Sequence, residues 1–240
     1  MSQTHLVMLR DALFLLFILT CVWIVLKGLS KYEIPLKTVT IVITIWVLVL
    51  AALSISGFLN DFSNFPPRIM LVLIIPLLVL IWFVLSKHTN AVVNKVPAEW
   101  MVKMQSFRIL VELFIWWAYL QKDLPIQMTF EGRNFDILVG LTAPLVAMLW
   151  LKQGREKPML VLIWNILGLL VLLNIVVTAV LSMPTPNQYF FNEPANTLVG
   201  RFPWVYLPGI FVTLAIALHL ISIRQMAQLT IGQPLSHAGQ

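Results

Sequence analysis

Long apolar segments recur along the chain and are separated by short polar stretches. A membrane-spanning helix takes roughly 18 to 20 apolar residues, and the segments approach or exceed this length. They are predicted at residues 11–27, 37–58, 67–86, 102–121, 134–151, 159–182 and 203–224. The segments are apolar on all sides and lack the alternation of a membrane β-barrel, so they predict helices. We therefore expect an all-α fold, a polytopic membrane helix bundle of about seven transmembrane helices that forms a single domain over residues 1–240.

The composition strengthens the membrane assignment. Hydrophobic residues make up 60% of the chain and charged residues 11%, whereas a soluble domain has about 25% charged residues. The formal net charge is +6, but the Lys and Arg residues are spread over short loops and form no block. This distribution disfavours a nucleic-acid partner and makes the lipid bilayer the expected one.

The basic residues alternate between the predicted loops. Ten lie in the first, third and fifth loops and the tail, against five on the opposite side. The first set is Lys27, Lys31, Lys37, Lys87, Lys95, Lys103, Lys152, Arg155, Lys157 and Arg224; the second is Arg10, Arg68, Lys122, Arg133 and Arg201. Because cytoplasmic loops of membrane proteins carry an excess of Lys and Arg, we expect an N-out, C-in arrangement.

The fourth predicted helix carries charge where a membrane protein tolerates it least. Gln105, Arg108, Glu112 and Tyr119 are spaced by three, four and seven residues and share one helical face. The spacing of Arg108 and Glu112 predicts an ion pair along the helix, near the middle of the bilayer. Such a pair is either a functional site or a structural pair that fixes helix packing, and both explanations stay open.

Two further predicted helices place polar residues at a similar depth. Asn165 and His219 are expected to form one layer with Arg108, although a histidine hydrogen-bonded to a neighbouring helix is the simpler explanation of His219 alone. The candidate intramembrane polar site therefore comprises Gln105, Arg108, Glu112, Tyr119, Asn165 and His219.

A polar turn opens the fifth predicted helix on the outer side. Asn134 is placed to cap the helix and Asp136 lies in its first turn, where the helix dipole favours an anion. Capping does not explain Glu131 and Arg133, which we expect to be held by contacts from the loop at 184–204. The candidate outer-mouth site comprises Glu131, Arg133, Asn134, Asp136, Glu193 and Arg201.

The outer loop at 184–204 is the longest and is rich in Asn, Pro and aromatic residues. Long ordered loops tend to be functional, although a loop that caps helix ends explains it equally well. Trp204 and Tyr206, at its end, are expected to anchor the last helix at the lipid headgroups.

Three runs carry a resemblance to known proteins. MTFEGRNFDILVGLTAP at 128–144, FPWVYLPGIF at 202–211 and HLISIRQ at 219–225 resemble a group of uncharacterised bacterial multi-pass inner-membrane proteins. The resemblance implies a bacterial inner (cytoplasmic) membrane location and no particular activity, ligand or catalytic residue.

The sequence contains no catalytic signature that we identify, and it predicts no cofactor. Only His219 of the four histidines lies within a predicted span, so a haem or multi-histidine metal site is not expected. We favour the binding or passage of a small polar solute or a proton through the bundle. The alternative is a membrane sensor or assembly subunit whose outer loops contact a protein partner, with purely structural buried charges. An enzyme, with Glu112 or Glu131 as acid or base, is the least favoured class.

Overall fold

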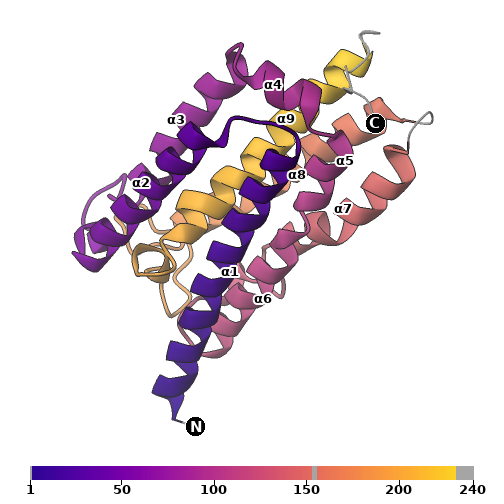
Figure 1. Ribbon diagram of the computed structural model, residues 1–240. Coiled ribbons are helices and arrows are strands. Elements are labelled where there is room, and N and C mark those ends of the chain that lie inside the picture. The colour runs from indigo at the N-terminus through magenta and orange to yellow at the C-terminus, as the bar shows by residue number, and fades with distance from the viewer. Residues whose placement is uncertain (1, 153–155, 231–240) are drawn as a thin grey trace.

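The computed structural model describes residues 2–152 and 156–230, and this part of the chain contains helices and no strand (Figure 1). Arg155 of the predicted basic loop lies outside the described residues. The α-helices are α1 (Gln3–Lys31), α2 (Leu36–Ile55), α3 (Met70–Leu85), α4 (Thr89–Lys95), α5 (Ala98–Met104), α6 (Phe107–Leu120), α7 (Asp136–Trp150), α8 (Pro158–Leu181) and α9 (Thr213–Thr230). Single turns of 3-10 helix form η1 (Phe58–Asn60), η2 (Ile126–Met128) and η3 (Leu198–Gly200), and η4 (Leu207–Val212) is π-helical.

Four helices are long and apolar enough to cross a membrane: α1, α2, α8, and the continuous helix formed by η4 and α9. The pair α3 and α4 is bent by 71° and would count as a fifth span. Helices α6 and α7, with 14 and 15 residues, are shorter than a full crossing. The chain is therefore an all-helical, multi-pass membrane protein, and the count of seven spans stays a prediction.

The fourth predicted span is divided into α5 and α6. Around the division, the N–H of Gln105 donates to Val102 O and the N–H of Arg108 donates to Gln105 O. These bonds reach back three residues, as in a 3-10 turn, and they tighten the chain before α6 begins at Phe107. A hydrophobic pattern does not reveal this break, because both sides of it continue the same apolar run.

Helix α9 lies at the centre of the bundle (Figure 1) and packs along α8 while also contacting α3, α4 and α5. Two polar side chains of α9, the buried Gln225 and the half-buried Arg224, donate hydrogen bonds to these neighbours. The Gln225 Nε2 donates to the carbonyls of Val93 and Val96, at the end of α4. Arg224 donates to the carbonyl of Val84 and, at 2.7 Å, to the side chain of Asn90. Helix α9 therefore fixes the bent end of the α3–α4 pair.

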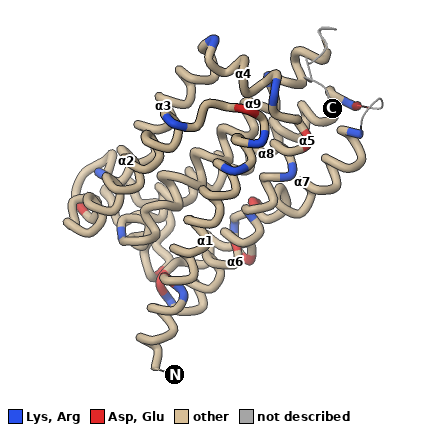
Figure 2. Tube along the Cα trace, in the orientation of Figure 1, with Lys and Arg blue, Asp and Glu red and all other residues tan. Residues whose placement is uncertain are grey.

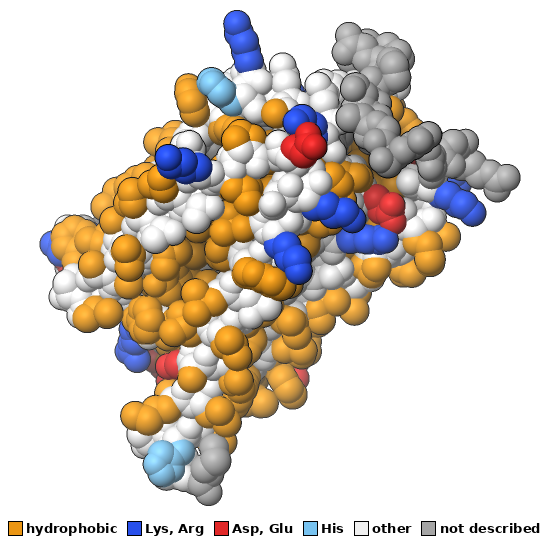
Figure 3. All heavy atoms as spheres, viewed as in Figure 1, with side chains coloured by type: hydrophobic (Ala, Val, Ile, Leu, Met, Phe, Trp, Pro, Cys, Tyr) orange, Lys and Arg blue, Asp and Glu red, His pale blue; other side chains and the backbone are white. Residues whose placement is uncertain are grey.

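The outer surface of the bundle is apolar along its length. Large exposed hydrophobic side chains follow α1, α2, α3 and α8, and Figure 3 shows them covering the flank of the molecule. Lys and Arg gather toward the end of the bundle where α4 and α5 lie, with a second, smaller group near the N-terminal end of α1 (Figure 2). An apolar flank with charged ends is the arrangement that a bilayer requires.

Candidate functional site

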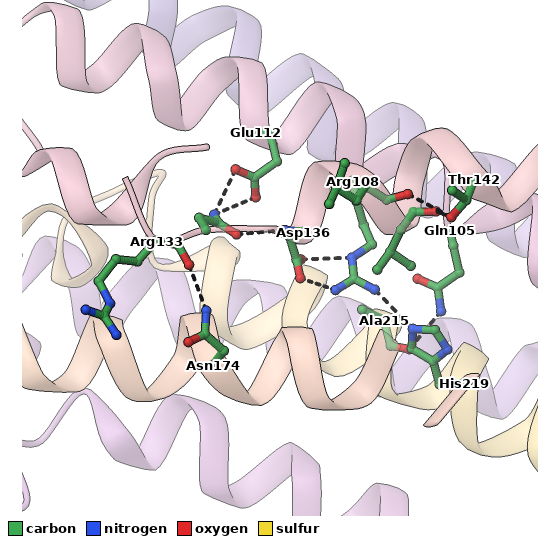
Figure 4. Close-up of polar contacts among 12 residues, drawn as sticks. Gln105, Arg108, Glu112, Arg133, Asp136, Thr142, Asn174, Ala215 and His219 are labelled. Atoms are coloured by element: carbon green, nitrogen blue, oxygen red, sulfur yellow. Dashed lines mark hydrogen bonds and ion pairs between the residues drawn. The ribbon is translucent and has the colours of Figure 1, made fainter. Parts of the chain in front are cut away.

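Arg108 forms a buried ion pair with Asp136, the first residue of α7 (Figure 4). Its Nε donates to Asp136 Oδ2 at 2.8 Å, and its Nη2 donates to Asp136 Oδ1. The predicted pairing of Arg108 with Glu112 along α6 is therefore wrong. Helices α6 and α7 pack against each other, so the fork of Arg108 meets a carboxylate across the interface, which permits the two parallel bonds that a guanidinium favours.

Glu112 lies one turn further along α6 and is held by Asn134. The Nδ2 of Asn134 donates to both carboxylate oxygens of Glu112, at 2.8 and 2.7 Å, and also to Met128 O at 3.0 Å. Glu112 is 1% exposed. Among the described residues, no cation pairs with its carboxylate. The site thus holds two acidic side chains and one guanidinium.

Asn134 also accepts a hydrogen bond from the first residue of α7. Its Oδ1 accepts a hydrogen bond from the N–H of Asp136 at 3.0 Å. Phe135 is the residue that immediately precedes the helix. Asn134 therefore caps α7 as predicted, but from one position earlier in the chain. One amide side chain therefore satisfies a helix N-terminus with its oxygen and a buried carboxylate with its nitrogen.

A chain of hydrogen bonds continues from Arg108 to α9 and α8. Arg108 Nη1 donates to His219 Nε2 at 3.0 Å, because a guanidinium carries only donors. The histidine hydrogen then lies on Nδ1 and is donated to Asn165 Oδ1 at 2.8 Å, while Asn165 Nδ2 donates to Ser222 Oγ at 2.9 Å. Arg108, His219 and Asn165 thus form the single layer that their depths in the sequence predicted.

Gly168 makes room for the histidine ring. A Cβ at this position would lie 2.4 Å from His219 Cε1, closer than any side chain tolerates. Ser222, which ends the chain of hydrogen bonds, was not predicted. It lies three residues after His219 on α9, and this spacing is the signal in the sequence that points to it.

Two predicted members of the intramembrane site lie apart from this network. Gln105 is buried in the turn before α6 and donates to Ala215 O at 3.1 Å. Tyr119 is half-buried and lies two turns beyond Glu112, about 10 Å along the axis. It makes none of the contacts described above, because the helix carries it away from the layer.

The charged residues of the outer turn have separate partners. Arg133 lies over the ring of Phe190, with 5.2 Å between its Cζ and the ring centroid, which confirms the expected contact with the 184–204 loop. For Glu131 the expectation is wrong, since its Oε1 accepts from Trp116 Nε1 of α6 at 3.0 Å. The turn folds tightly onto η2: a Cβ on Gly132 would lie 2.3 Å from Ile126 O.

The other two predicted members of the outer mouth bond within their own loop. Glu193 Oε2 accepts from the N–H of Ala195 at 3.2 Å. Arg201 Nη2 reaches Thr197 Oγ1 at 3.4 Å. In the described part of the chain neither forms an ion pair with Glu131 or Arg133. The six residues of the predicted outer mouth therefore do not form one site.

A cavity of about 80 Å³ borders the buried charges. Its wall is mostly apolar, with side chains of α3, α6, α8, α9 and η4, and it includes the polar residues Arg108, Glu112, Asn134 and Asp136. This volume exceeds the roughly 10 to 15 Å³ that one water requires. The π-helix η4, which contains Pro208, belongs to this wall, and π-helical turns are frequent at functional sites.

A second buried arginine was missed. Arg10 on α1 donates through Nη1 to Asp123 Oδ2 at 2.6 Å and through Nη2 to Asp11 Oδ1 at 2.8 Å. Trp204 Nε1 donates to the same Oδ1 at 2.8 Å, and Arg10 lies over the Trp204 ring. The apolar runs conceal this cluster, because Arg10 and Asp11 lie at the very start of the first run and Asp123 follows the fourth.

The expected interfacial anchors are buried. Trp204 is 0% exposed and stacks on Phe14 with 4.4 Å between ring centroids. The Tyr206 hydroxyl donates to Val47 O of α2 at 3.1 Å. The prediction that both residues sit at the lipid headgroups is wrong, since their polar atoms have partners inside the protein.

Residues 65–227 match a family described as a domain of unknown function, DUF8737. The chain belongs to this family. The matched region contains the Arg108 network and all of the residues around the cavity, whereas Arg10 and Asp11 precede it. No curated protein and no solved structure matches the chain. In the described residues, no three His, Cys, Asp or Glu side chains gather in a way that could hold a metal ion.

Proposed function

We propose that the protein binds and passes protons, or a small polar solute that exchanges with a proton, at Glu112. The observation that carries the proposal is the position of this carboxylate: it borders the cavity and has an amide as its partner, while the guanidinium of Arg108 is engaged by Asp136. An uncompensated charge at this depth is costly, and a proton on Glu112 removes it. The polar residues on the cavity wall, Arg108, Glu112, Asn134 and Asp136, are the hydrogen-bond partners that a water delivering this proton would need.

The proposed setting is the inner membrane of a bacterium, with seven crossings, the N-terminus outside and the C-terminus in the cytoplasm. The excess of Lys and Arg in alternate loops supports this orientation. Reporter fusions at Lys152 and Gln188 should then report opposite sides, and a shared side would contradict the orientation.

Proton binding is tested by infrared difference spectra of the purified protein recorded across a pH series. We expect a carbonyl-stretch band of a protonated carboxyl that disappears in Glu112→Gln. The matched control is Glu131→Gln, the same substitution at an exposed position on the outer turn, and it should keep the band. A band that survives Glu112→Gln would assign the proton elsewhere.

Proton passage is tested in liposomes that contain the protein and a pH-sensitive dye, with a potassium gradient and valinomycin as the driving force. The wild type and Glu131→Gln should change the internal pH faster than protein-free liposomes, and Glu112→Gln should not. Equal rates for wild-type and protein-free liposomes would refute proton passage and leave proton binding as a separate question.

A second candidate function rests on a different observation. Tyr189 and Phe191 of the 184–204 loop are 70% and 74% exposed. Exposed aromatic side chains on an outer loop suit contact with a protein partner, as a sensor or assembly subunit would require. Under this function the replacement of both residues by Ser would abolish partner binding, while the infrared band of Glu112 would be unchanged.

A further inference from the structure

An open groove of about 480 Å³ lies between the C-terminal end of α1 and α5. Its wall is formed by Ile24, Lys27, Gly28, Ser30, Lys31 and Trp100. Gly28 determines its shape, because a Cβ there would lie 2.3 Å from Cζ2 of Trp100. The absence of a side chain lets the indole lie against the backbone of α1 and form the groove wall.

Two lysines of this groove lack an acidic partner. Lys27 and Lys31 are exposed and four residues apart, so they lie on one face of α1. The two glutamates of this region are engaged by other lysines. These pairs are Glu33 with Lys95 at 3.6 Å and Glu99 with Lys103 at 2.5 Å. Within the described part of the chain, the groove therefore carries two uncompensated positive charges.

The groove changes from basic to apolar along the axis of α1. Ile24, one turn before Gly28, forms its apolar end, and the exposed side chains of Leu16 and Leu19 continue the same helix toward the middle of the bundle. Figure 3 shows Lys and Arg side chains at this end of the molecule and many hydrophobic side chains on the flank below them. Phospholipids have the same order, with a charged headgroup followed by acyl chains.

We propose that this groove binds the headgroup of an anionic phospholipid. Lys27 and Lys31 contact the phosphate, and the hydroxyl of Ser30 donates a hydrogen bond to it. Trp100 and Ile24 pack against the glycerol and the first acyl carbons. Basic residues beside a membrane-spanning helix attract anionic lipids, and a pocket between helices gives the attraction a defined place.

The test is native mass spectrometry of the purified full chain with added phosphatidylglycerol, compared with zwitterionic phosphatidylethanolamine. We expect phosphatidylglycerol to be retained preferentially, and Lys27→Gln with Lys31→Gln to weaken its binding by roughly one order of magnitude. The matched control is Lys37→Gln with Lys87→Gln, which removes the same charge from exposed lysines outside the groove. Elution of both double variants as single, monodisperse species establishes that they are folded.

Three results would overturn the proposal. Equal retention of the two lipids in the wild type would mean that charge does not select the ligand. Equal losses in the two double variants would mean that the groove is not the site. Displacement of phosphatidylglycerol by millimolar inorganic phosphate would assign the groove to a soluble anion. The infrared band of Glu112 is independent of all three.

Discussion

Two arginines are buried in the described part of the chain, Arg10 and Arg108, and each lies beside two carboxylates. Arg10 is bonded to both of its carboxylates, Asp11 and Asp123, whose side chains are each 28% exposed. Of its two carboxylates, Arg108 is bonded only to Asp136, and Glu112 borders a cavity. The Arg10 cluster, at one end of the bundle, therefore has every charge paired and is in contact with solvent, whereas the Arg108 cluster, inside the bundle, is buried and leaves one carboxylate without a cation. This difference makes the Arg10 cluster a structural link between α1, Asp123 and Trp204, and the Arg108 cluster the candidate for function.

Asp136→Asn should have the largest effect on stability. It leaves the guanidinium of Arg108 buried without its counter-charge, which costs about 3 to 5 kcal/mol at a buried position. The free energy of unfolding, measured by SDS titration in mixed micelles, should fall by this amount. The double variant Arg108→Met with Asp136→Asn should recover much of the loss. An unchanged single variant would mean that Glu112 or water replaces Asp136.

Gly168→Ala should cause the second-largest loss of stability, because the added methyl group would overlap the ring of His219. Overpacking of this kind costs roughly 1 to 3 kcal/mol. The same SDS titration measures the effect. Gly57→Ala would be a poor control, because Gly57 has a φ of 75° and any side chain there strains the backbone. Ala217→Gly, at a half-buried position of α9, measures the separate effect of helix propensity, which is about 0.5 to 1 kcal/mol in favour of Ala. A Gly168→Ala variant as stable as the wild type would show that the His219 ring can move aside.

Asp123→Asn should have a smaller effect. The asparagine oxygen still accepts from Arg10, Asp11 retains its charge, and the site is partly exposed, so we expect a loss of about 1 kcal/mol. A loss as large as that of Asp136→Asn would remove the contrast between the two clusters. Differential scanning fluorimetry of the two variants side by side makes this comparison directly.

Glu112→Gln should change stability least, by less than about 1 kcal/mol. The glutamine carbonyl continues to accept from Asn134, and Arg108 keeps Asp136. The prediction is checked in the same melting experiment as Asp123→Asn. A large destabilisation by Glu112→Gln would show that the negative charge of Glu112 is itself part of the fold.

The sequence predicted where the apolar helices lie and which residues share a depth, because hydrophobic periodicity and rise per residue determine both. It did not predict which helix lies next to which. Arg108 was assigned to Glu112 because they are four residues apart, whereas its partner Asp136 comes from the adjacent helix and had already been explained by capping. Trp204 and Arg10 were misjudged for the same reason, since their partners lie 193 and 113 residues away along the chain.

Asn134 couples the position of the first turn of α7 to the protonation state of Glu112, because its side chain is bonded to both. Its nitrogen bonds the carboxylate most strongly when that group is charged, and its oxygen holds the first N–H of the helix that carries Asp136. Neutralising Glu112 therefore loosens the side chain that positions the counter-ion of Arg108. By thermodynamic reciprocity, any force that displaces the first turn of α7 also changes the affinity of Glu112 for its proton.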